Sequence, residues 1–424
     1  MKKRITAAVL AAVLTVSMMT ACGSEVSDTD SSKALDNSSL SDTSSQPDSS
    51  SDESSSSQAD SSSQTSEETT TTSRSETTTT TTSASQTTSA KPVTTAKPAA
   101  TSKPVIKTTV PAATVAPSTN NNVSVPQSGQ WIGSVVVCDR NLGAKIRGLI
   151  SFGGSESMAQ YFCNMVNSVK SAVGSGVNVY TMGAPVSSAF YTPKNMSGVT
   201  TDQHKAITDL NKYLRNVKNI DTYAALAPHV NEYIYYRTDH HWTELAAYYA
   251  AEAFAKTAGV PFKPLSQYQA GVKQGFTGSM YTYSNCQEFK TYPDTYYYWK
   301  PKNSYTTTYY NGYFQNGQKS SLFLDWASGS GCYCTVLGSD MNLAEIKTDV
   351  KNGRTLVLIK DSYGNALVPY FVGSFEKIYV LDMRYTNVNL RSFFKQVGAT
   401  DILFGSSLSS FYTSSRVDGI RAIL

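Results

Sequence analysis

No aromatic side chain occurs before Trp131 in this chain of 424 residues, and that absence constrains the fold more than any other feature. Residues 23–130 consist mainly of Ser, Thr, Asp, Glu and Pro. Such a segment cannot bury enough apolar surface to offset the conformational entropy lost on ordering. We therefore expect a long disordered Ser/Thr-rich stalk over 23–130. The remainder, 131–424, has a suitable length for one α/β domain.

A targeting segment precedes the stalk. Residues 1–4 are positively charged, and the apolar run over 5–19 is too short to act as a stable membrane span. The run leads into Ala21 and Cys22, a pattern that resembles a bacterial lipoprotein signal over 1–22. That resemblance implies lipidation of Cys22 and anchoring at the extracellular face of the cell membrane. An ordinary secretory signal is the alternative, and both interpretations predict export.

The length of the stalk and the charge of the domain constrain the location and the partners more weakly. A relaxed coil of this length reaches about 60 Å, which suits a protein held out into or through a cell wall. Of the 36 basic and 32 acidic residues, 9 and 12 precede residue 131, which leaves 27 and 20 in the domain. This mild excess fits an anionic surface polymer without requiring one. No basic run or RNA-binding motif indicates nucleic acid.

The cysteines beyond Cys22 do not define a site. There are five of them, so at least one thiol is unpaired within the chain, and "CYC" at 332–334 lacks the further Cys or His of a tight zinc site. A disulfide in an exported domain remains open, and its pairing cannot be assigned.

Short apolar runs alternate with helical periods from 131 onward, which predicts a mostly parallel sheet with helices on both faces. Strands are expected over 133–139, 177–185, 354–360, 377–382 and 401–405. Helices are expected over 156–173 and 202–218, and from a cap at Thr243 to about Lys256. The Tyr-rich, Gly- and Asn-interrupted segment 275–335 predicts β-hairpins inserted between two α/β portions.

Polar residues follow several of the predicted strands, and sites in such sheets form at the carboxyl ends of strands. Asp361 and Ser362 follow 354–360, Arg384 follows 377–382, and the loop 183–185 follows 177–185. Ser362 is a reasonable nucleophile on a tight strand-to-helix turn, and the N–H groups that begin the helix would stabilise an oxyanion. Asp361 is expected only to orient the turn or cap the helix.

A chain with four His places two of them side by side, His240 and His241, directly after Asp239. In an extended backbone Asp239 and His241 face the same side, and His240 points the other way. One carboxylate can then hold one imidazole in the tautomer that a general base requires. A hydrolase or acyltransferase needs this arrangement next to a nucleophile.

Three strings resemble the DHHW family of bacterial exported proteins: "TDHHWT" at 238–243, "KDSYGNALVPYF" at 360–371 and "YVLDMRY" at 379–385. That family is similar to SGNH-hydrolase-like proteins that acetylate alginate and other exopolysaccharides. The resemblance covers about 131–410 and implies an SGNH-hydrolase-like α/β fold. It matches Asp239, His241 and Trp242 to the Asp-x-His-Trp motif and Ser362 to the nucleophile.

The chain departs from ordinary SGNH hydrolases in two ways. The Ser follows the Asp and His along the chain instead of preceding them, which convergent sites tolerate. There is no Gly-Asp-Ser block, because Lys360 stands where the Gly would be. Gly364, Asn365, Arg384, His240 and Trp242 are further candidates for the oxyanion site or for substrate contacts.

Each of these candidate residues also has a purely structural interpretation. The Asp-His-His cluster also suits a helix cap with backbone hydrogen bonds. A metal site made of Asp239, His240 and His241 lacks a second cluster, because His204 and His229 lie on helical stretches. Ser362 also suits a helix N-cap, Arg384 a partner for a nearby carboxylate, and Trp242 the core. The Tyr-rich hairpins would either stack on sugars or form an edge surface.

The sequence therefore predicts a lipid-anchored, cell-surface carbohydrate O-acetyltransferase or acetylesterase that uses Ser362, His241 and Asp239, without a cofactor or metal. The partners would be a cell-wall or exopolysaccharide glycan and, by the resemblance, a membrane-bound O-acyltransferase that supplies the acyl group. The alternative is a non-catalytic surface lipoprotein that binds glycan through the aromatic hairpins.

Overall fold

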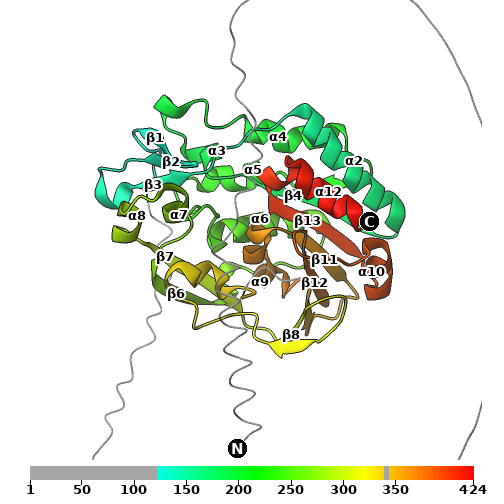
Figure 1. The fold of residues 1–424 in the computed structure, drawn as a ribbon. Helices are drawn as coiled ribbons and strands as arrows, with labels where there is room; N and C mark the ends of the chain where they lie inside the picture. Colours follow the sequence, from blue (N-terminus) through cyan, green and yellow to red (C-terminus); the bar gives the residue numbers. More distant parts are fainter. Residues whose placement is uncertain (1–121, 339–342) are drawn as a thin grey trace, which may run out of the picture. The chain divides into compact units, whose positions relative to one another are not determined.

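The computed structural model describes residues 122–338 and 343–424 (Figure 1). Within these residues the largest sheet has eight strands. The signal, Cys22 and nearly all of the stalk lie outside the described residues. The first strand, β1 (Gly129–Ile132), begins two residues before Trp131. Just ahead of it, the backbone N–H groups of Gln127 and Ser128 donate to the Asp139 carboxylate. The folded part therefore includes residues ahead of the first aromatic residue.

The centre of the large sheet is parallel. Its parallel strands are, in spatial order, β5 (Lys218–Asn219), β4 (Asn178–Ala184), β13 (Asp401–Ser407), β11 (Thr355–Lys360) and β12 (Lys377–Asp382). The antiparallel strands β10 (Leu343–Thr348), β8 (Tyr305–Tyr310) and β9 (Gln318–Ser320) extend it beyond β12. Every residue of β11 and β13 is buried, as expected for strands covered on both faces.

Helices cover both faces of this sheet (Figure 1). On one face α2 (Glu156–Val173) packs with α10 (Leu390–Val397), α11 (Leu408–Phe411) and α12 (Ser414–Ala422). On the other, α6 (Glu244–Ala258) packs against α9 (Val368–Phe371). The chain moves from β11 to β12 and then back past β11 to β13, so right-handed crossovers place α9 and α10 on opposite faces. The predicted α/β class with a mostly parallel sheet is confirmed.

Capping chemistry explains why two helices begin and end where the sequence predicts. Ser155 accepts a hydrogen bond from the Met158 N–H at the start of α2. Thr243 accepts one from the Ala246 N–H at the start of α6, and Gly259 ends that helix in the left-handed region at φ 66°.

Three predictions need correction. The segment predicted as one helix over 202–218 instead forms α4 (Gln203–Asp209), a 3₁₀ turn and β5. The predicted strand at 133–139 exists as β2 (Val135–Cys138), but it pairs with β1 and β3 (Arg147–Leu149) in a separate antiparallel sheet. The segment 275–335 is only partly an insertion, because β8 and β9 belong to the large sheet.

The remaining part of the Tyr-rich segment forms a hairpin beside that sheet. Strand β6 (Tyr268–Phe276) pairs with β7 (Asp294–Pro301), and α7 (Met280–Ser284) and α8 (Glu288–Thr291) connect them. The other short helices are α3 (Ser188–Tyr191) and α5 (Thr222–Leu226). Among the described residues, no helix has the length and apolar character needed to cross a membrane.

Candidate active site

The Asp239–His241 segment lies in a bend that leads directly into α6. A β-bridge between Tyr235 and Trp242 closes the bend, and Asp239 Oδ1 accepts the His241 backbone N–H at 3.0 Å. Asp239 and His241 therefore face each other as predicted, but a bend achieves this and not an extended chain. For the same reason His240 does not point away, because its ring centroid lies 3.7 Å from that of His241.

A continuous hydrogen-bond chain joins a carboxylate, an imidazole and a hydroxyl. Asp239 Oδ1 lies 2.6 Å from His241 Nδ1, and His241 Nε2 lies 2.7 Å from Ser362 Oγ. An ionised carboxylate only accepts hydrogen bonds, so Nδ1 carries the ring proton in neutral His241. The lone pair on Nε2 is then free to accept the Ser362 hydroxyl proton. This is the geometry that a general base and its nucleophile require.

The surroundings of Asp239 keep it ionised. Burial favours the neutral acid, but the charges of His241 and His240 and the hydrogen bonds from His241 and the Ser279 N–H outweigh burial and hold the pKa of Asp239 well below its usual range. The Ser279 N–H donates to Oδ2 at 2.8 Å. Gly278 lets the backbone approach this closely, because a Cβ there would lie 2.3 Å from Oδ2.

Ser362 opens the 3₁₀ turn Ser362–Leu367, which follows β11. Asp361 fixes the turn by accepting from the Tyr363 N–H at 2.9 Å and from the hydroxyls of Ser407 and Ser410 at 2.6 and 2.8 Å. Ser407 ends β13, so one carboxylate fastens the turn that carries the nucleophile to the neighbouring strand. Asp361 thus has the orienting and capping role that the sequence suggested.

The two small candidates of this turn are closely packed. The Gly364 N–H donates to the Asp361 carbonyl at 3.1 Å, so it is already engaged within the turn. A Cβ at Gly364 would lie 2.4 Å from the Lys360 Cβ and 2.7 Å from the Gly405 carbonyl oxygen, which accounts for Gly at this position. Asn365 is buried.

Trp242 is a structural link between the two halves of the site. Its side chain is 1% exposed, and the indole N–H donates to the Tyr363 carbonyl at 3.0 Å. This bond ties the start of α6 to the Ser362 turn and leaves no ring face open to a sugar. In the same region the Tyr363 hydroxyl donates to the His240 carbonyl at 2.5 Å.

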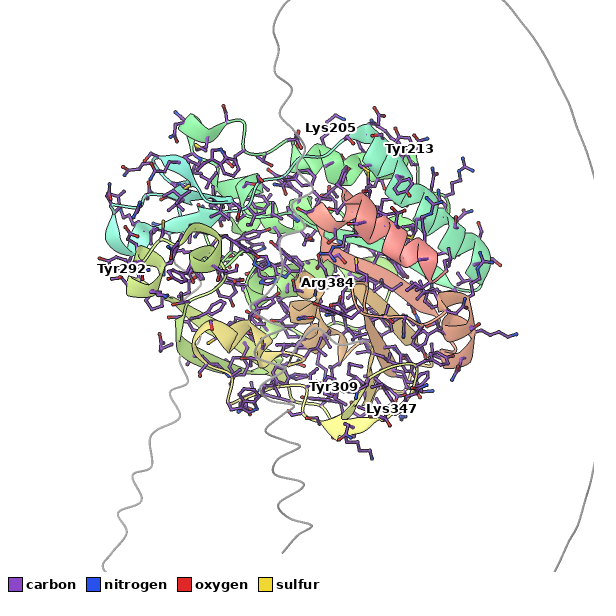
Figure 2. The ribbon with its side chains drawn as sticks, in the orientation of Figure 1. Lys205, Tyr213, Tyr292, Tyr309, Lys347 and Arg384 are labelled. Carbon is purple, nitrogen blue, oxygen red and sulfur yellow. The ribbon has the colours of Figure 1, made fainter. Side chains whose placement is uncertain are left out.

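Arg384 is held by a carboxylate at the end of β12. Its Nε and Nη2 donate to the two Asp382 oxygens at 2.9 and 2.8 Å, and Lys360 Nζ lies 2.6 Å from Asp382 Oδ2. Lys360 and Asp382 are register partners on β11 and β12. The Lys that stands in place of a Gly therefore takes part in a buried ion-pair network. Arg384 lies near the middle of the domain in Figure 2.

The remaining candidates lie at the edges of the site. His240 Nδ1 is 2.6 Å from the Ser279 hydroxyl. In the 183–185 loop, the Pro185 carbonyl accepts from the Tyr235 hydroxyl at 2.5 Å. Away from the site, His204 pairs with Asp221 and His229 with Glu232.

One group among the described residues has metal-ligand types close together, namely Asp239, His240 and His241, with ligand atoms within 4.8 Å. Both ring nitrogens of His241 already contact Asp239 and Ser362, and His240 Nδ1 contacts Ser279. An ion bound to these atoms would have to displace those contacts, so the donor set suits proton transfer better than metal binding.

Sequence reasoning did not identify three contributors: Gly278, Ser279 and Tyr333. Tyr333 lies in the 3₁₀ segment Gly329–Thr335, and its ring stacks on His241 with centroids 3.8 Å apart. No motif marks any of them, because each reaches the site through tertiary packing. Tyr333 is the central residue of "CYC", and Cys138, Cys163, Cys286 and Cys332 are free and buried.

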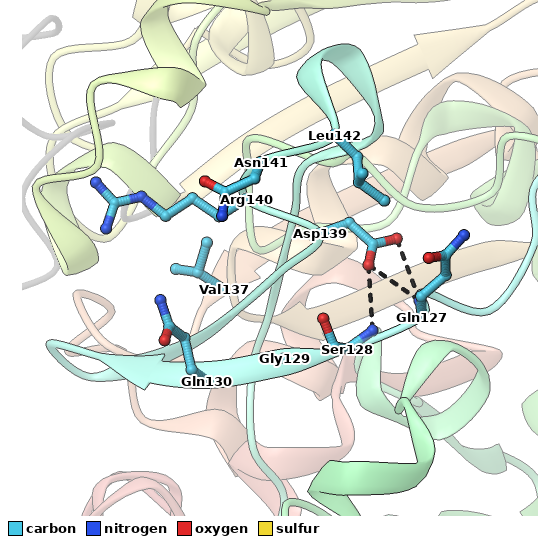
Figure 3. A pocket seen from close by; sticks show the side chains of 9 residues that line it. All are labelled: Gln127, Ser128, Gly129, Gln130, Val137, Asp139, Arg140, Asn141 and Leu142. Carbon is cyan, nitrogen blue, oxygen red and sulfur yellow. Dashed lines mark hydrogen bonds between the residues drawn. The ribbon is translucent and has the colours of Figure 1, made fainter.

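A polar depression of about 240 Å³ lies beside the β1–β2 hairpin (Figure 3). Its lining includes Gln127, Ser128, Asp139 and Arg140, and Asp139 is occupied with backbone N–H groups of the segment before β1. A second depression of about 250 Å³ lies between the start of α2 and α4. Neither contains a candidate catalytic residue.

Comparison with known proteins identifies the family. The DHHW protein family model matches residues 102–381. A crystal structure of a DHHW family protein from Eubacterium siraeum is 38% identical, covers 70% of this chain and 98% of its own, and has a TM-score of 0.65. Bacillus cereus PatB1 with a sulfonyl adduct is 16% identical, covers 67% and 99%, and has a TM-score of 0.54. No curated protein matches the chain. The chain belongs to the DHHW family.

Proposed function

We propose that this protein is a serine-dependent acyl-handling enzyme that acts on a cell-surface glycan, as an O-acetyltransferase or an acetylesterase. The observation that carries the proposal is the hydrogen-bond chain from Asp239 through His241 to Ser362, with links of 2.6 and 2.7 Å. Asp239, His241 and Ser362 are all buried at the end of β11. Such an arrangement activates a hydroxyl for attack on a carbonyl.

The first half-reaction forms an acyl-enzyme. Ser362 Oγ attacks the acyl carbonyl carbon while its proton moves to His241 Nε2. Asp239 stabilises the imidazolium through Nδ1–H and stays ionised because its pKa is low. When the tetrahedral intermediate collapses, the bond to the leaving group breaks and His241 returns the proton to the departing atom.

The second half-reaction uses the same residues in reverse roles. A glycan hydroxyl gives its proton to His241 Nε2 and attacks the acyl carbon, and Ser362 leaves and recovers its proton. Transfer to a sugar gives an O-acetylated glycan; transfer to water gives acetate and makes the enzyme an esterase. Nothing in this scheme needs a cofactor, because Ser362 carries the acyl group and His241 carries the proton.

The surface glycan and the anchoring belong to the same proposal. Lipidation at Cys22 would hold the domain on a stalk at the outer face of the membrane. The acyl group would come from a membrane-bound O-acyltransferase. The signal pattern and the aromatic-free segment 23–130 support the anchoring.

The non-catalytic alternative, glycan binding by the Tyr-rich hairpins, has less support. On β7 and β8 the side chains of Tyr296, Trp299 and Tyr309 are buried, and their strand neighbours Tyr297, Tyr298 and Tyr305 pack against the core clusters. Most of these rings serve the interior and offer little open surface for stacking on sugars.

The test is ester hydrolysis by the purified full chain. Wild type should release p-nitrophenol from p-nitrophenyl acetate, and Ser362→Ala should reduce kcat by about 10³-fold or more. Ser330→Ala changes an exposed serine; it is the matched control and should keep the wild-type rate. Activity that persists in both Ser362→Ala and His241→Ala would refute the proposal.

A further inference from the structure

The imidazole of His241 is enclosed by two rings as well as by its two hydrogen bonds. The Tyr333 ring lies parallel to it, with centroids 3.8 Å apart and an interplanar angle of 9°. The His240 ring lies 3.7 Å away at a tilt of 37°. The neighbouring rings limit tilting, and the bonds to Asp239 and Ser362 limit rotation in the ring plane.

Tyr333 also contacts the nucleophile's own backbone. Its hydroxyl donates to the Ser362 carbonyl at 3.1 Å. Burial raises the pKa of Tyr333 well above the usual range, so the phenol stays neutral and remains a donor. Tyr333 therefore contacts both the ring of the base, His241, and the main chain of the nucleophile, Ser362. These two residues are 121 positions apart in sequence.

The loop that leads into the Tyr333 segment is held in place by a lysine. Lys273 on β6 directs Nζ at three loop carbonyls, those of Leu324, Asp325 and Ala327, at 3.1, 3.0 and 2.6 Å. The three ammonium hydrogens match the three acceptors. Burial lowers the pKa of Lys273. Lys273 therefore uses its three N–H donors to hold the loop that leads to Tyr333.

We propose that Tyr333 is a positioning residue, which keeps the His241 ring aligned between Asp239 and Ser362, and that Lys273 acts through the loop to hold Tyr333 in place. This rests on the proposed function. An aromatic face within 6 Å also stabilises an imidazolium by cation–π attraction, so the contact strengthens when His241 takes the proton. The effect belongs to the transition state and should appear in kcat.

Two substitutions separate the ring from the hydroxyl. Tyr333→Leu removes the stacked ring and should lower kcat for ester hydrolysis about 10- to 100-fold, with KM changed less than about twofold. Tyr333→Phe keeps the ring and should recover most of that loss. Ser330→Ala, in the same loop and exposed, should match wild type. Equal losses in Tyr333→Phe and Tyr333→Leu, or a loss confined to KM, would overturn the role of the ring.

A double-mutant cycle tests the link to Lys273. Lys273→Met keeps the stem and removes the three donors, and should lower kcat in the same direction as Tyr333→Leu but by less. If the lysine acts through the tyrosine, the double variant should be about as slow as Tyr333→Leu alone. Fully multiplicative effects would mean that the two residues act independently.

A structural readout keeps this inference separate from the proposed function. Crystal structures of wild type and Tyr333→Leu give the distance from His241 Nε2 to Ser362 Oγ without any turnover. We expect the ring of His241 to be displaced or to take a second rotamer in the variant. An unchanged distance near 2.7 Å and a single rotamer would overturn the positioning role even if the enzyme is active. A wild type that is inactive while the ring moves in Tyr333→Leu would count against the function alone.

Discussion

At the residue scale, the central carboxylate is the most informative position. Asp239→Asn keeps the size of the side chain, but its amide can donate to His241 Nδ1 and thus favour the wrong tautomer. We expect kcat to fall about 10³- to 10⁴-fold, with KM little changed. Initial rates at pH 7–8 measure this. A variant that retains a tenth or more of wild-type kcat would show that Asp239 does not set the tautomer.

The glycine beside that carboxylate offers a steric test. Gly278→Ala adds a Cβ 2.3 Å from Asp239 Oδ2, and either the backbone or the carboxylate must move. We expect at least about a tenfold loss of kcat, since a misplacement of about 1 Å costs up to about 10². Gly198→Ala, where a Cβ has nothing within 4 Å, is the control and should behave as wild type. Equal rates for the two variants would contradict the close packing at Asp239.

At the element scale, helix α6 buries a titratable group in its first turn. Burial raises the pKa of Glu244 to about 7, against the opposing hydrogen bond that the Tyr236 hydroxyl donates. The folded protein thus binds more protons than the unfolded chain between pH 4.5 and 7. The free energy of unfolding should therefore fall as pH rises through that window and level off above it.

Glu244→Gln tests this, because Gln resembles the protonated acid. The variant should lose that slope and should be more stable than wild type at pH 8, by up to about 3 kcal/mol. Denaturant titrations at pH 4.5, 6 and 8 measure it, and the exposed Glu252→Gln on the same helix is the control. If the free energy of unfolding of Glu244→Gln still falls between pH 4.5 and 7, other groups cause the pH dependence.

The elements that sequence located well are those with local signals. Caps at Ser155 and Thr243 and the glycines that follow the helices locate α2 and α6, and runs of mainly apolar residues locate β11, β12 and β13. The segment 202–218 kept a helical pattern but broke after α4, because packing places residues 218–219 beside β4 as β5. Local propensity cannot foresee a strand that exists only through its neighbour.

The candidate site was predictable to a similar degree. Asp239, His241 and Ser362 were found from residue chemistry and from the positions of strand ends, and they do lie within hydrogen-bonding distance. The expected outward turn of His240 was wrong, since the chain bends there. Tyr333 and Gly278 were missed because their contacts depend on long-range packing, which leaves no periodic trace in the sequence.

At the scale of the whole molecule, we propose that a lipid on Cys22 attaches the catalytic domain to the membrane through residues 23–130. Cys22→Ala should then move the protein from the membrane fraction to the medium without changing esterase activity. Cell fractionation with Ser27→Ala as the control measures this. Membrane association that persists in Cys22→Ala would show that the cysteine is not the anchor.

Active-site labelling of the full chain gives the most direct test of the central claim that Ser362 is activated by His241. We choose phenylmethylsulfonyl fluoride, because it sulfonylates activated serine hydroxyls. Intact-mass and peptide mass spectrometry should find one sulfonyl group on Ser362, none in Ser362→Ala, and much slower uptake in His241→Ala. An unlabelled wild type, or labelling that is as fast in Ser362→Ala, would contradict the account.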